Sequence, residues 1–510
     1  MLIVGAGPTG LALALWLTKF GIRVRIIDKL GASGTTSRAL AVQARTLEYY
    51  QQIGLADAVI ERGQKVAGLN LWVRSHRAAR VPLENLGEGL TPFPFPMIFP
   101  QDEHETLLIE RLRQHGVEVE RMVELTGFEE REEKIIATLL RNGTDETSSF
   151  AYIAGCDGAR SRVREVLNTG FPGGTYDHLF YVADVEAGGP PVNGELHVDL
   201  DDADFLAVFP MSGSGRARLV GSVRDDVAKD HEHLRLQDVQ GRAVQNLKIE
   251  IIRVNWFSTY RVHHRVAQQF RRGRAFLLGD AAHIHSPVGG QGMNTGIGDA
   301  INLAWKLAAS IKEPASAALL DSYEPERIAF ARRLVATTDR AFTAVISTSG
   351  LARIVRTRII PLFAPAFFRI PAARRFAFRT VSQIQVNYRH SSLSGGRAGN
   401  LCGGDRLPWV RVGAGGGSGE FNFGALASLD WQVHVYGTAS PDLLKACADH
   451  GMALHVFEWR APMKHAGLKR DAAYLIRPDG YIALAVERGE TTAISDYLRD
   501  KAIRSRGMHS

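Results

Sequence analysis

The chain has 510 residues, of which 45% are hydrophobic and 23% are charged, a composition typical of a globular protein with several domains. Its three cysteines form no CxxC pair, and no signal peptide or membrane-spanning run is expected, so the sequence argues against a metal site, a disulfide framework and a transmembrane segment. The net charge of +7 favours anionic ligands such as nucleotides. No alternation of aromatic and basic residues indicates a nucleic-acid partner. We expect a cytoplasmic protein.

The first 28 residues have the pattern of a dinucleotide-binding unit. An apolar strand, a glycine-rich turn over residues 5–10 and a helix lead to a second strand that ends at Asp28. In such a turn Gly5 permits the tight bend, Gly7 lets backbone amides approach a pyrophosphate, and Gly10 allows the helix to pack closely on the strand. Asp28 can accept hydrogen bonds from a ribose diol. The pattern leaves open whether the ligand is NAD or FAD.

Two further features can contribute to this nucleotide site. Arg38 follows a glycine-rich loop and precedes a helix that is expected from Ala39 onward. Its guanidinium could pair with a pyrophosphate, or it could be an ordinary surface arginine. Gln101 opens a second helix, which is expected over residues 106–115.

Strands are expected after each of these features. Residues 66–100 predict antiparallel strands inserted in the nucleotide-binding part, and residues 126–152 predict a meander with a hairpin turn at 141–144. Residues 152–164 predict another strand, turn and helix. Asp157 in that turn either caps the helix or lies near a cofactor, and both can hold together.

A β-rich segment follows at residues 175–270. Short strands recur through it, and we expect them to form a separate domain against the nucleotide-binding domain. One face of its sheet could wall a pocket for an aromatic ligand, or the same side chains could be ordinary sheet core. The residues assigned to this face are Phe180, His197, Phe205, Phe209 and Phe257.

Residues 275–307 return the chain to the first domain. An apolar strand leads to Asp280, then to a loop with glycines at 289, 290 and 292, and then to a helix. An acidic turn followed by a helix N-terminus suits an extended, partly anionic ligand that lies across the carboxyl end of a sheet.

The rest of the chain predicts helices and a C-terminal unit. Residues 340–404 contain no Asp or Glu but several arginines, so this helical region could contact a membrane surface or a partner, although a layer packed against the other domains is the simpler interpretation. A glycine-rich linker at 391–419 precedes an α/β unit at 420–510. The order of its elements looks thioredoxin-like, and a structural role or a homodimer contact is open.

Three motifs occur in a fixed order along the chain. They are the glycine turn at 5–10, Cys156-Asp157-Gly158-Ala159-Arg160-Ser161, and Gly279-Asp280-Ala281-Ala282-His283. With Ser37-Arg38-Ala39 and Gln101, they resemble the single-component FAD-dependent aromatic hydroxylases typified by p-hydroxybenzoate hydroxylase. The resemblance covers residues 1–390, and residues 477–483 resemble part of the thioredoxin-like extension of the phenol hydroxylase branch.

The resemblance implies an α/β fold: a Rossmann-type FAD-binding domain with an inserted β-sheet substrate domain, plus a C-terminal thioredoxin-like domain lacking CxxC. The FAD-binding domain would comprise residues 1–174 and, together with a helical layer, residues 271–390. The substrate domain would be 175–270, the linker 391–419 and the C-terminal domain 420–510.

The resemblance also implies which residues form the site. Arg38 and Pro287 are assigned to catalysis. The residues that would bind FAD come from all of the motifs and are Gly5, Gly7, Pro8, Thr9, Gly10, Asp28, Lys29, Arg38, Gln101, Val123, Asp157, Asp280, Pro287, Gly290, Gly292, Met293 and Asn294.

Individual roles follow from the family. The adenosine ribose would be held by Asp28, and Val123 would lie near the adenine. The ribityl chain would be held by Asp280, and residues 287–294 would wrap the flavin ring. Asp157 belongs to a motif implicated in both FAD and NADPH binding.

The implied activity is the hydroxylation of a phenol-like or polyketide-like aromatic compound with O2 and NADPH or NADH, through a flavin C4a-hydroperoxide. Some phenol hydroxylases carry a carboxylate where this chain has Leu40, so no base that activates the substrate is assigned. The same fold could perform epoxidation, Baeyer–Villiger oxidation or oxidative removal of a substituent instead. A non-catalytic flavin-binding sensor is a further alternative, against which the intact loop at 287–294 argues.

Overall fold

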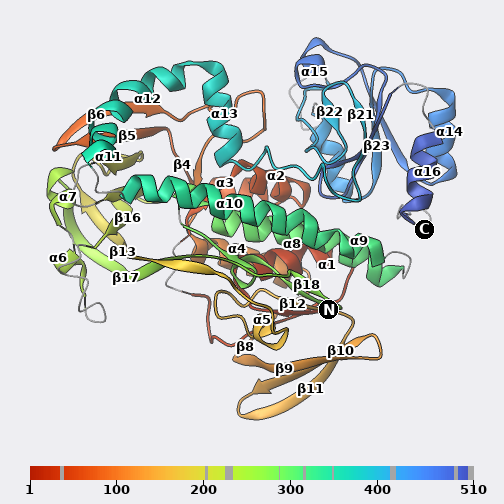
Figure 1. Ribbon diagram of the computed structural model, residues 1–510, viewed down its shortest axis with the longest axis horizontal. Helices are drawn as coiled ribbons and strands as arrows, with labels where there is room; N and C mark the ends of the chain where they lie inside the picture. The colour runs from red at the N-terminus through yellow and green to blue at the C-terminus, as the bar shows by residue number, and fades with distance from the viewer. Residues whose placement is uncertain are drawn as a thin grey trace.

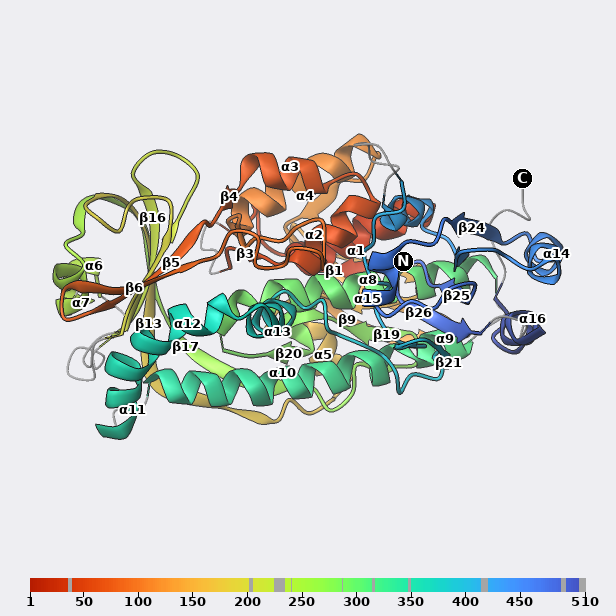
Figure 2. The same ribbon diagram turned by 90° about the horizontal axis from the view of Figure 1, so that it is seen from above.

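The computed structural model describes residues 1–34, 39–200, 205–223, 234–239, 241–286, 288–313, 317–346, 350–413, 421–487 and 492–503. Arg38, Pro287 and most of the glycine-rich stretch at 413–419, all singled out in the sequence, lie outside the described residues. A mostly parallel sheet and its helices occupy the middle of the molecule, with a large, mostly antiparallel sheet at one end and the C-terminal unit at the other (Figures 1 and 2).

The central sheet is built from strands that are far apart in the sequence. Its order is β18-β19-β12-β1-β2-β8, and all neighbours are parallel except β18 and β19. Short apolar strands that are buried along their whole length suit a parallel sheet covered on both faces. Three strands have this character, namely β1 (Leu2–Val4), β12 (Ile153–Gly155) and β19 (Ala275–Leu277). The others are β2 (Arg25–Asp28), β8 (Val119–Arg121) and β18 (Arg271–Arg272).

Three helices pack around this sheet. α1 (Pro8–Lys19) lies against both α8 (Gly292–Lys312) and α4 (Gln101–Gln114). Every residue of α8 from Asn294 to Ala308 is buried, as expected of a helix inside a core. The predicted strand, turn and helix at the N-terminus and at 275–307 are confirmed, whereas α4 begins at Gln101 rather than at residue 106.

The segment that follows residue 38 is extended where a helix was expected. β3 (Ala41–Val42) pairs antiparallel with β7 (Met97–Ile98), which pairs in turn with β4 (Gln64–Lys65). α2 (Ala44–Gln52) begins only after this pairing and is followed by α3 (Ala56–Arg62). The predicted helix start at Ala39 is therefore wrong, because Ala41 and Val42 form a strand that pairs with β7.

The large sheet has eight strands in the order β20-β17-β13-β16-β15-β14-β5-β6. The strands expected within 175–270 are present, and two more come from 68–82. β5 pairs parallel with β14, with Leu69 opposite Leu196, so β5 and β6 complete this sheet and are not part of the central one. The strands are β5 (Gly68–Val73), β6 (His76–Pro82), β13 (Gly173–Gly188), β14 (Leu196–Asp199), β15 (Leu206–Pro210), β16 (Arg216–Ser222), β17 (Glu250–Val266) and β20 (His283–Ile284).

The aromatic residues that were predicted to share one face of this sheet are distributed over both of its faces. Phe180 pairs with Tyr260, whereas Phe257 pairs with Ala183. Because positions 257 and 260 are an odd number of residues apart on one strand, their side chains point to opposite faces. Phe257 packs on the outer face, in the apolar cluster that includes α6 (Leu236–Val239) and α7 (Gly241–Asn246).

The other members of the set divide in the same way. Phe205 packs with Phe180, and Phe209 packs against the main core around the central sheet, so these three share the inner face. His197 lies on the outer face, where its Nδ1 accepts a hydrogen bond from Trp72 Nε1 at 2.9 Å. The prediction of one aromatic wall is therefore wrong for His197 and for Phe257.

A small meander projects from the central sheet. It consists of β9 (Val123–Arg131), β10 (Lys134–Arg141) and β11 (Thr144–Phe150). Asn142 and Gly143 have φ angles of +50° and +79°, which suit the two central positions of a tight hairpin turn. The predicted meander and its turn are confirmed.

Helices dominate the chain between residues 317 and 381. They are α9 (Ala317–Asp321), α10 (Tyr323–Ile346), α11 (Gly350–Ile354), a π-helical turn at Val355–Ile359, α12 (Ile360–Arg369) and α13 (Pro371–Val381). α12 lies against β6 of the large sheet. None of the helices in the part of the chain that the structure describes has the length and apolar character needed to cross a bilayer.

The C-terminal unit is a six-stranded sheet in the order β22-β21-β26-β25-β23-β24, with helices beside it. Two of its strands, β21 (Gly395–Ala398) and β22 (Leu401–Cys402), come from the segment expected to be linker, because β21 pairs with β26. That segment is therefore not wholly loop. The short helix α15 (Ala461–His465) was not predicted. The other elements fall where expected and are β23 (Gln432–Tyr436), α14 (Pro441–Asp449), β24 (Ala453–Phe457), β25 (Ala473–Ile476), β26 (Ile482–Val486) and α16 (Thr492–Asp500).

A buried ionic cluster joins the C-terminal unit to the rest of the molecule. Glu326 on α10 accepts hydrogen bonds from both terminal nitrogens of Arg477, at 2.8 and 3.0 Å, and from Lys306 Nζ at 2.8 Å. Arg477 also donates to both carboxylate oxygens of Asp479. The carbonyl oxygen of Asp479 accepts from Arg45 on α2 at 2.7 Å.

The charges in this cluster depend on one another. Burial alone would raise the pKa of Glu326, but Arg477 and Lys306 hold it well below its ordinary value. Burial lowers the pKa of Lys306 to about 8, against the opposing effect of Glu326. Removing one partner would leave the others charged in a medium of low dielectric constant, which is costly.

We predict that Arg477→Met lowers the free energy of unfolding by about 3–5 kcal/mol, because Glu326 and Asp479 would keep buried carboxylates without their shared cation. Denaturant titration followed by circular dichroism measures the change. Arg499→Met is the control, since the Arg499 side chain is 73% exposed and an exposed ion pair contributes about 1 kcal/mol or less. Equal losses in the two variants would contradict the prediction.

Candidate functional site

The turn between β1 and α1 needs its glycines for different physical reasons. Gly5 has a φ of +101°, and a Cβ on it would lie 2.3 Å from the carbonyl oxygen of Cys156. A Cβ on Gly10 would lie 2.0 Å from the carbonyl oxygen of Gly5. Both positions exclude a side chain, which confirms the tight turn and the close packing of the helix. A Cβ on Gly7 would meet nothing within 4 Å, so the open side of the turn lies at the helix N-terminus, where an anion is favoured.

The three sequence motifs meet at this turn. A Cβ on Gly5 would also lie 2.8 Å from the Cα of Asp157, in the second motif. Thr9 Oγ1 lies 2.6 Å from the position of a Cβ on Gly279, in the third motif, and 2.2 Å from that of one on Gly296 in α8. Thr9 therefore packs between the third motif and α8, while the buried Pro8 occupies the first turn of α1, where its missing amide costs little.

Asp28 lies at the end of β2, as expected for a ribose-binding acid. Its Oδ2 accepts from the Ala6 amide at 2.7 Å and its Oδ1 from the Leu30 amide at 2.9 Å. Arg121 Nη1 lies 3.6 Å from Oδ2. The carboxylate thus ties the glycine turn to the second strand. Lys29 beside it has an exposed side chain.

Gln101 and Glu105 form a pair at the start of α4. The Gln101 amide donates to Ala39 O at 3.1 Å, and its side-chain Nε2 donates to Glu105 Oε1 at 2.8 Å. Burial raises the pKa of Glu105 to about 7, although Gln101 and Arg121 act in the opposite direction. Glu105 is a buried acid that the sequence did not single out.

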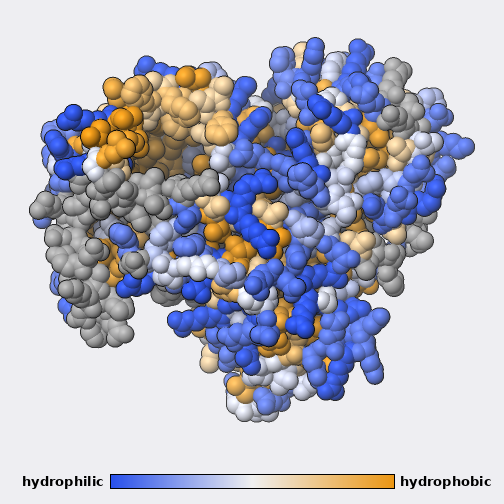
Figure 3. Space-filling model, viewed as in Figure 1, coloured by the Kyte–Doolittle hydropathy of each residue, from blue (hydrophilic) through white to orange (hydrophobic). Residues whose placement is uncertain are grey.

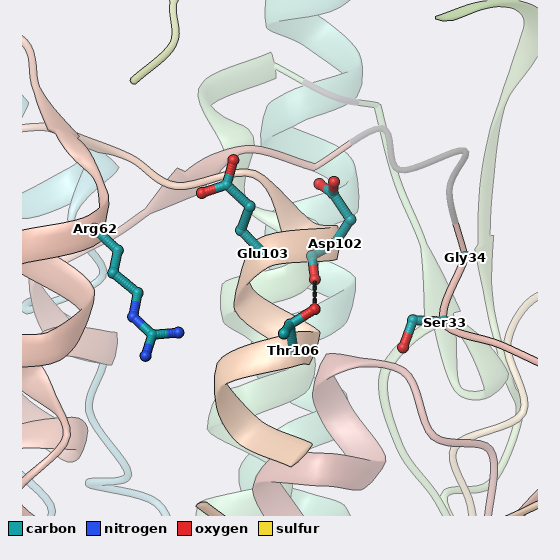
Figure 4. Close-up of a pocket in the computed structure, with 6 residues that line it drawn as sticks. All are labelled: Ser33, Gly34, Arg62, Asp102, Glu103 and Thr106. Carbon is teal, nitrogen blue, oxygen red and sulfur yellow. Dashed lines mark hydrogen bonds between the residues drawn. The ribbon is translucent and has the colours of Figure 1, made fainter. Parts of the chain in front are cut away.

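A cavity of 540 Å³ lies beside this helix start and is lined by Ser33, Gly34, Arg62, Asp102, Glu103 and Thr106. Figure 4 shows two carboxylates at the first turn of α4 and the arginine on the neighbouring helix. That arginine is paired with Glu110 at 2.9 Å. The lining therefore offers no net positive charge to a pyrophosphate, which the glycine turn suits better.

Asp157 supports the N-terminus of α5 (Arg162–Val166), although the N-cap residue of this helix is Ser161 and not Asp157 as one of the two expectations had it. Its Oδ1 accepts from Ser161 Oγ at 2.6 Å and its Oδ2 from the amides of Arg162 and Val163. Burial nevertheless raises its pKa. Val123 is buried at the start of β9, and its contact with an adenine remains a prediction.

The glycine loop of the third motif is shaped by its backbone. Asp280 lies in a short 3-10 turn, η2 (Gly279–Ala281), with an exposed side chain. Gly289 and Gly290 have φ angles of +76° and +62°, and a Cβ on Gly290 would lie 2.6 Å from Ala41 Cβ. α8 then begins at Gly292, so the unpaired amides of its first turn lie at the end of this loop. Met293 in that turn packs against the main core.

Asn294 anchors the loop through its side chain. Its Oδ1 accepts from the Gln43 amide at 2.8 Å and from Thr46 Oγ1 at 2.7 Å, and its Nδ2 donates to the carbonyl oxygens of Ala41 and Gly290 at 2.8 Å each. The carboxamide is fully used within the protein. Any contact of Asn294 with a flavin ring must therefore come from its backbone.

Further amide side chains that the sequence did not reveal hold the same loop. Gln43 Nε2 donates to Gly289 O at 2.8 Å. Gln291 Nε2 donates to Val381 O at 2.8 Å, and Gln291 Oε1 accepts from Gln383 Nε2 at 2.6 Å. Their spacing in the chain carries no signal, because the partners come together only through the fold.

His283 belongs to a second buried network behind the loop. Its Nε2 lies 2.7 Å from Asp299 Oδ2, which also accepts from the Gly279 amide at 3.0 Å. Arg327 Nε donates to Asp299 Oδ1 at 2.5 Å. His283 is therefore a structural residue that is buried and paired with Asp299.

His285 is different, because one of its nitrogens has no partner among the described residues. Its Nδ1 lies 2.8 Å from Ser286 O, so Nδ1 carries the proton and donates, while the buried Nε2 is unpaired. Burial lowers the pKa of His285 to about 4, which keeps the ring neutral. The ring lies 3.8 Å from the position of a Cβ on Gly292, so an acceptor nitrogen lies beside the first turn of α8.

These observations fit a dinucleotide-type cofactor. The open side of Gly7 and the start of α1 suit a pyrophosphate, and the unpartnered His285 nitrogen and the start of α8 suit a polar ring at the other end. The glycine turn, Asp28, Asp157 and Asp280 lie at or just after the carboxyl ends of β1, β2, β12 and β19, which is where such folds bind ligands. Arg38 and Pro287 lie outside the described residues.

The raised pKa of Glu105 has a measurable consequence. Its ordinary value is 4.5 and its folded value about 7, so folding takes up a proton between these values, and the stability from the protonated form is lost as the pH rises toward 7. We predict that Glu105→Gln stabilises the flavin-free protein at pH 8 by up to about 3 kcal/mol and has little effect at pH 4.5. Thermal unfolding at both pH values tests this, with Glu110→Gln on the same helix as control, since the Glu110 side chain is 43% exposed. An equal effect of Glu105→Gln at both pH values would contradict it.

Comparison with known proteins agrees with this geometry. Residues 1–338 match the family described as FAD binding domain. The chain is 35% identical over 413 residues to 6-methylpretetramide 4-monooxygenase of Streptomyces rimosus, covering 79% of this chain and 72% of that protein. It is 31% identical over 424 residues to pentachlorophenol 4-monooxygenase of Sphingobium chlorophenolicum, covering 80% and 75%. Among solved structures, the OxyS anhydrotetracycline hydroxylase from Streptomyces rimosus matches with a TM-score of 0.78 at 27% identity and covers 98% of both chains.

The family match covers well over half of the chain, and two named monooxygenases exceed 30% identity over more than three quarters of it. The resemblance drawn from the three sequence motifs is thereby confirmed. The chain belongs to the family of flavin-dependent aromatic monooxygenases, and it is a flavoprotein monooxygenase with FAD as its cofactor.

Proposed function

We propose that the protein uses NAD(P)H and O2 to hydroxylate an aromatic substrate of the phenol or polyketide class. One relative is named for 6-methylpretetramide and another for pentachlorophenol, so both classes are represented among similar proteins. The observation that carries the proposal is an indirect contact between the large sheet and the glycine loop, which residues 39–41 make. If that loop holds the flavin, the inner face of the large sheet would supply a wall of the substrate site from a different sheet.

That contact runs through the segment after residue 38. Arg218, buried on the inner face of the large sheet, forms an ion pair with Asp184 at 2.5 and 2.7 Å and donates from Nη1 to Ala39 O at 3.4 Å. Two residues further along the chain is Ala41, and a Cβ on Gly290 would lie 2.6 Å from its Cβ. A substrate between the inner face and the loop would therefore meet apolar rings such as Phe180 and a fixed ion pair.

The protein's own groups supply orientation and electrostatics. FAD, when bound, supplies the electron transfer and the activation of O2, which protein side chains cannot provide. The first-turn amides of α8 stabilise negative charge on a ring held at the loop by roughly 0.3–1 kcal/mol, and by more when buried. The unprotonated Nε2 of His285 can accept a hydrogen bond from an N–H or O–H of the cofactor or the substrate.

We propose that Leu40, the residue after Ala39, does not activate a phenol. Leu40 is buried and apolar, so it can neither accept nor donate a proton. Hydroxylation would then depend on a dry pocket and correct orientation rather than on a dedicated base. The C-terminal unit is proposed as a thioredoxin-like structural domain without a redox role, because Cys402 and Cys447 are free thiols on separate elements.

We predict that Asp280→Ala weakens FAD binding by about tenfold or more, because a hydrogen bond to a charged acceptor is worth roughly 1.5–3 kcal/mol. The exposed carboxylate lies one residue after Gly279, where a ribityl hydroxyl could reach it. The ratio of flavin to protein after purification and the dissociation constant from flavin fluorescence measure the effect. Asp496→Ala on the exposed face of α16 is the control. Full flavin retention in Asp280→Ala would remove this residue from the site.

The proposed reaction is tested by a panel of phenols and fused-ring aromatics. We expect at least one class to stimulate NAD(P)H oxidation and to yield a product with one added oxygen, located on a ring carbon. An epoxide, a ring-expanded ester or the loss of a ring substituent would assign the alternative oxidations. Oxidation of NAD(P)H that yields only hydrogen peroxide with every compound would contradict the proposed substrate class.

A further inference from the structure

Exposed apolar side chains are concentrated on one segment of the molecule. Of the sixteen large apolar side chains that are exposed within the described residues, ten lie between residues 350 and 381. Several are largely open to solvent, such as Leu351 at 74% and Leu362 at 71%. We call this set the apolar patch, and it comprises Leu351, Ile354, Ile359, Ile360, Leu362, Phe363, Phe367, Ile370, Phe376 and Val381.

The part of the apolar patch around α12 forms one apolar surface (Figure 3). Figure 3 shows an orange surface where Figure 1 draws α12 and its neighbours, while most of the rest of this face is hydrophilic. Ile360, Phe363 and Phe367 are spaced three and four residues apart within α12, so they lie on one side of that helix. Monomeric proteins rarely leave such an apolar surface uncovered without a function.

Basic side chains share the segment with the apolar patch. Between residues 350 and 381 there are seven arginines, and Asp and Glu are absent from the whole stretch 340–404. Five of these arginines are exposed, at positions 353, 358, 369, 375 and 379. An apolar helix face flanked by guanidinium groups, with no acid between them, matches the chemistry of an anionic lipid surface: acyl chains for the apolar side chains and phosphates for the arginines.

The charge pattern also disfavours a second copy of the chain as the occupant. A two-fold contact would place the apolar patch of one molecule against the same patch of another. The arginines would then face arginines, with no acid in the stretch to neutralise them. Like charges brought together in an interface cost several kcal/mol, whereas anionic phosphates would neutralise them.

We propose that the apolar patch is a docking surface for an anionic lipid membrane, on which the protein lies without crossing it. α11, α12 and α13 would rest at the level of the headgroups, with Ile360, Phe363 and Phe367 on one side of α12 reaching the acyl boundary and the exposed arginines contacting phosphates. This membrane contact would involve the outer surface of α11, α12 and α13, and it is independent of the proposed reaction.

Flotation with vesicles of phosphatidylcholine, with and without phosphatidylglycerol, tests the proposal on the full-length holoprotein. We expect the protein to float with the vesicles that contain phosphatidylglycerol, to do so much less with pure phosphatidylcholine, and to be released by high salt. The double variant Leu362→Ser/Phe363→Ser should lower binding by about tenfold or more. The double variant Arg358→Gln/Arg369→Gln should lower it chiefly at low ionic strength.

The matched control is Leu444→Ser/Val456→Ser, which removes two exposed apolar side chains of the C-terminal unit and should leave flotation unchanged. Flavin content and melting temperature establish that each variant is folded. The proposal is overturned by an absence of flotation with anionic vesicles, or by equal binding of the patch and control variants. It is also overturned if light scattering shows a dimer that the Leu362→Ser/Phe363→Ser variant dissociates, since the apolar patch would then be a contact between copies of the chain.

Discussion

The buried carboxylate of Glu326 is the interaction on which the arrangement of this molecule depends. It sits among Arg477, Lys306 and Asn302, which come from the C-terminal unit and from α8. A buried ionic cluster adds little net stability compared with a well-packed apolar core, but it is very costly to leave half-formed. The cluster therefore specifies one relative placement of the C-terminal unit, α8 and α10, and disfavours those that leave a charge unpaired.

The same two helices carry the network behind the flavin loop. Glu326 faces the C-terminal unit, and the next residue, Arg327, holds Asp299, which in turn fixes Gly279 and His283. The glycine loop is thus supported from behind by the residue adjacent to the one that anchors the C-terminal unit. From the front it is held by Asn294. The loop carries few side chains, which lets its backbone contact a flat ring. Hydrogen bonds from neighbouring residues fix its conformation.

Features contained within about thirty residues could be predicted from the sequence, and features that depend on distant pairing could not. The glycine turn, the second strand and Asp28 follow from spacing alone, and so does the hairpin at Asn142. The extended backbone at Ala41 could not be foreseen, because its partner β7 lies more than fifty residues away. Phe257 was assigned to the wrong face because the register that opposes it to Ala183 is set by β13. The amide groups that hold the loop share no motif.

The topology of the central sheet has a consequence for biosynthesis. β1 is synthesised well before its neighbour β12, which starts at Ile153, and before the next strand, β19, which starts at Ala275. Until β19 has been made, β12 has an open edge, and β5 in the large sheet is likewise unpaired on one side until β14 has been made. Unpaired strand edges promote association between chains. Nascent molecules of this protein therefore spend much of their synthesis in a state that favours chaperone binding, and premature termination would release aggregation-prone fragments rather than a working nucleotide-binding domain.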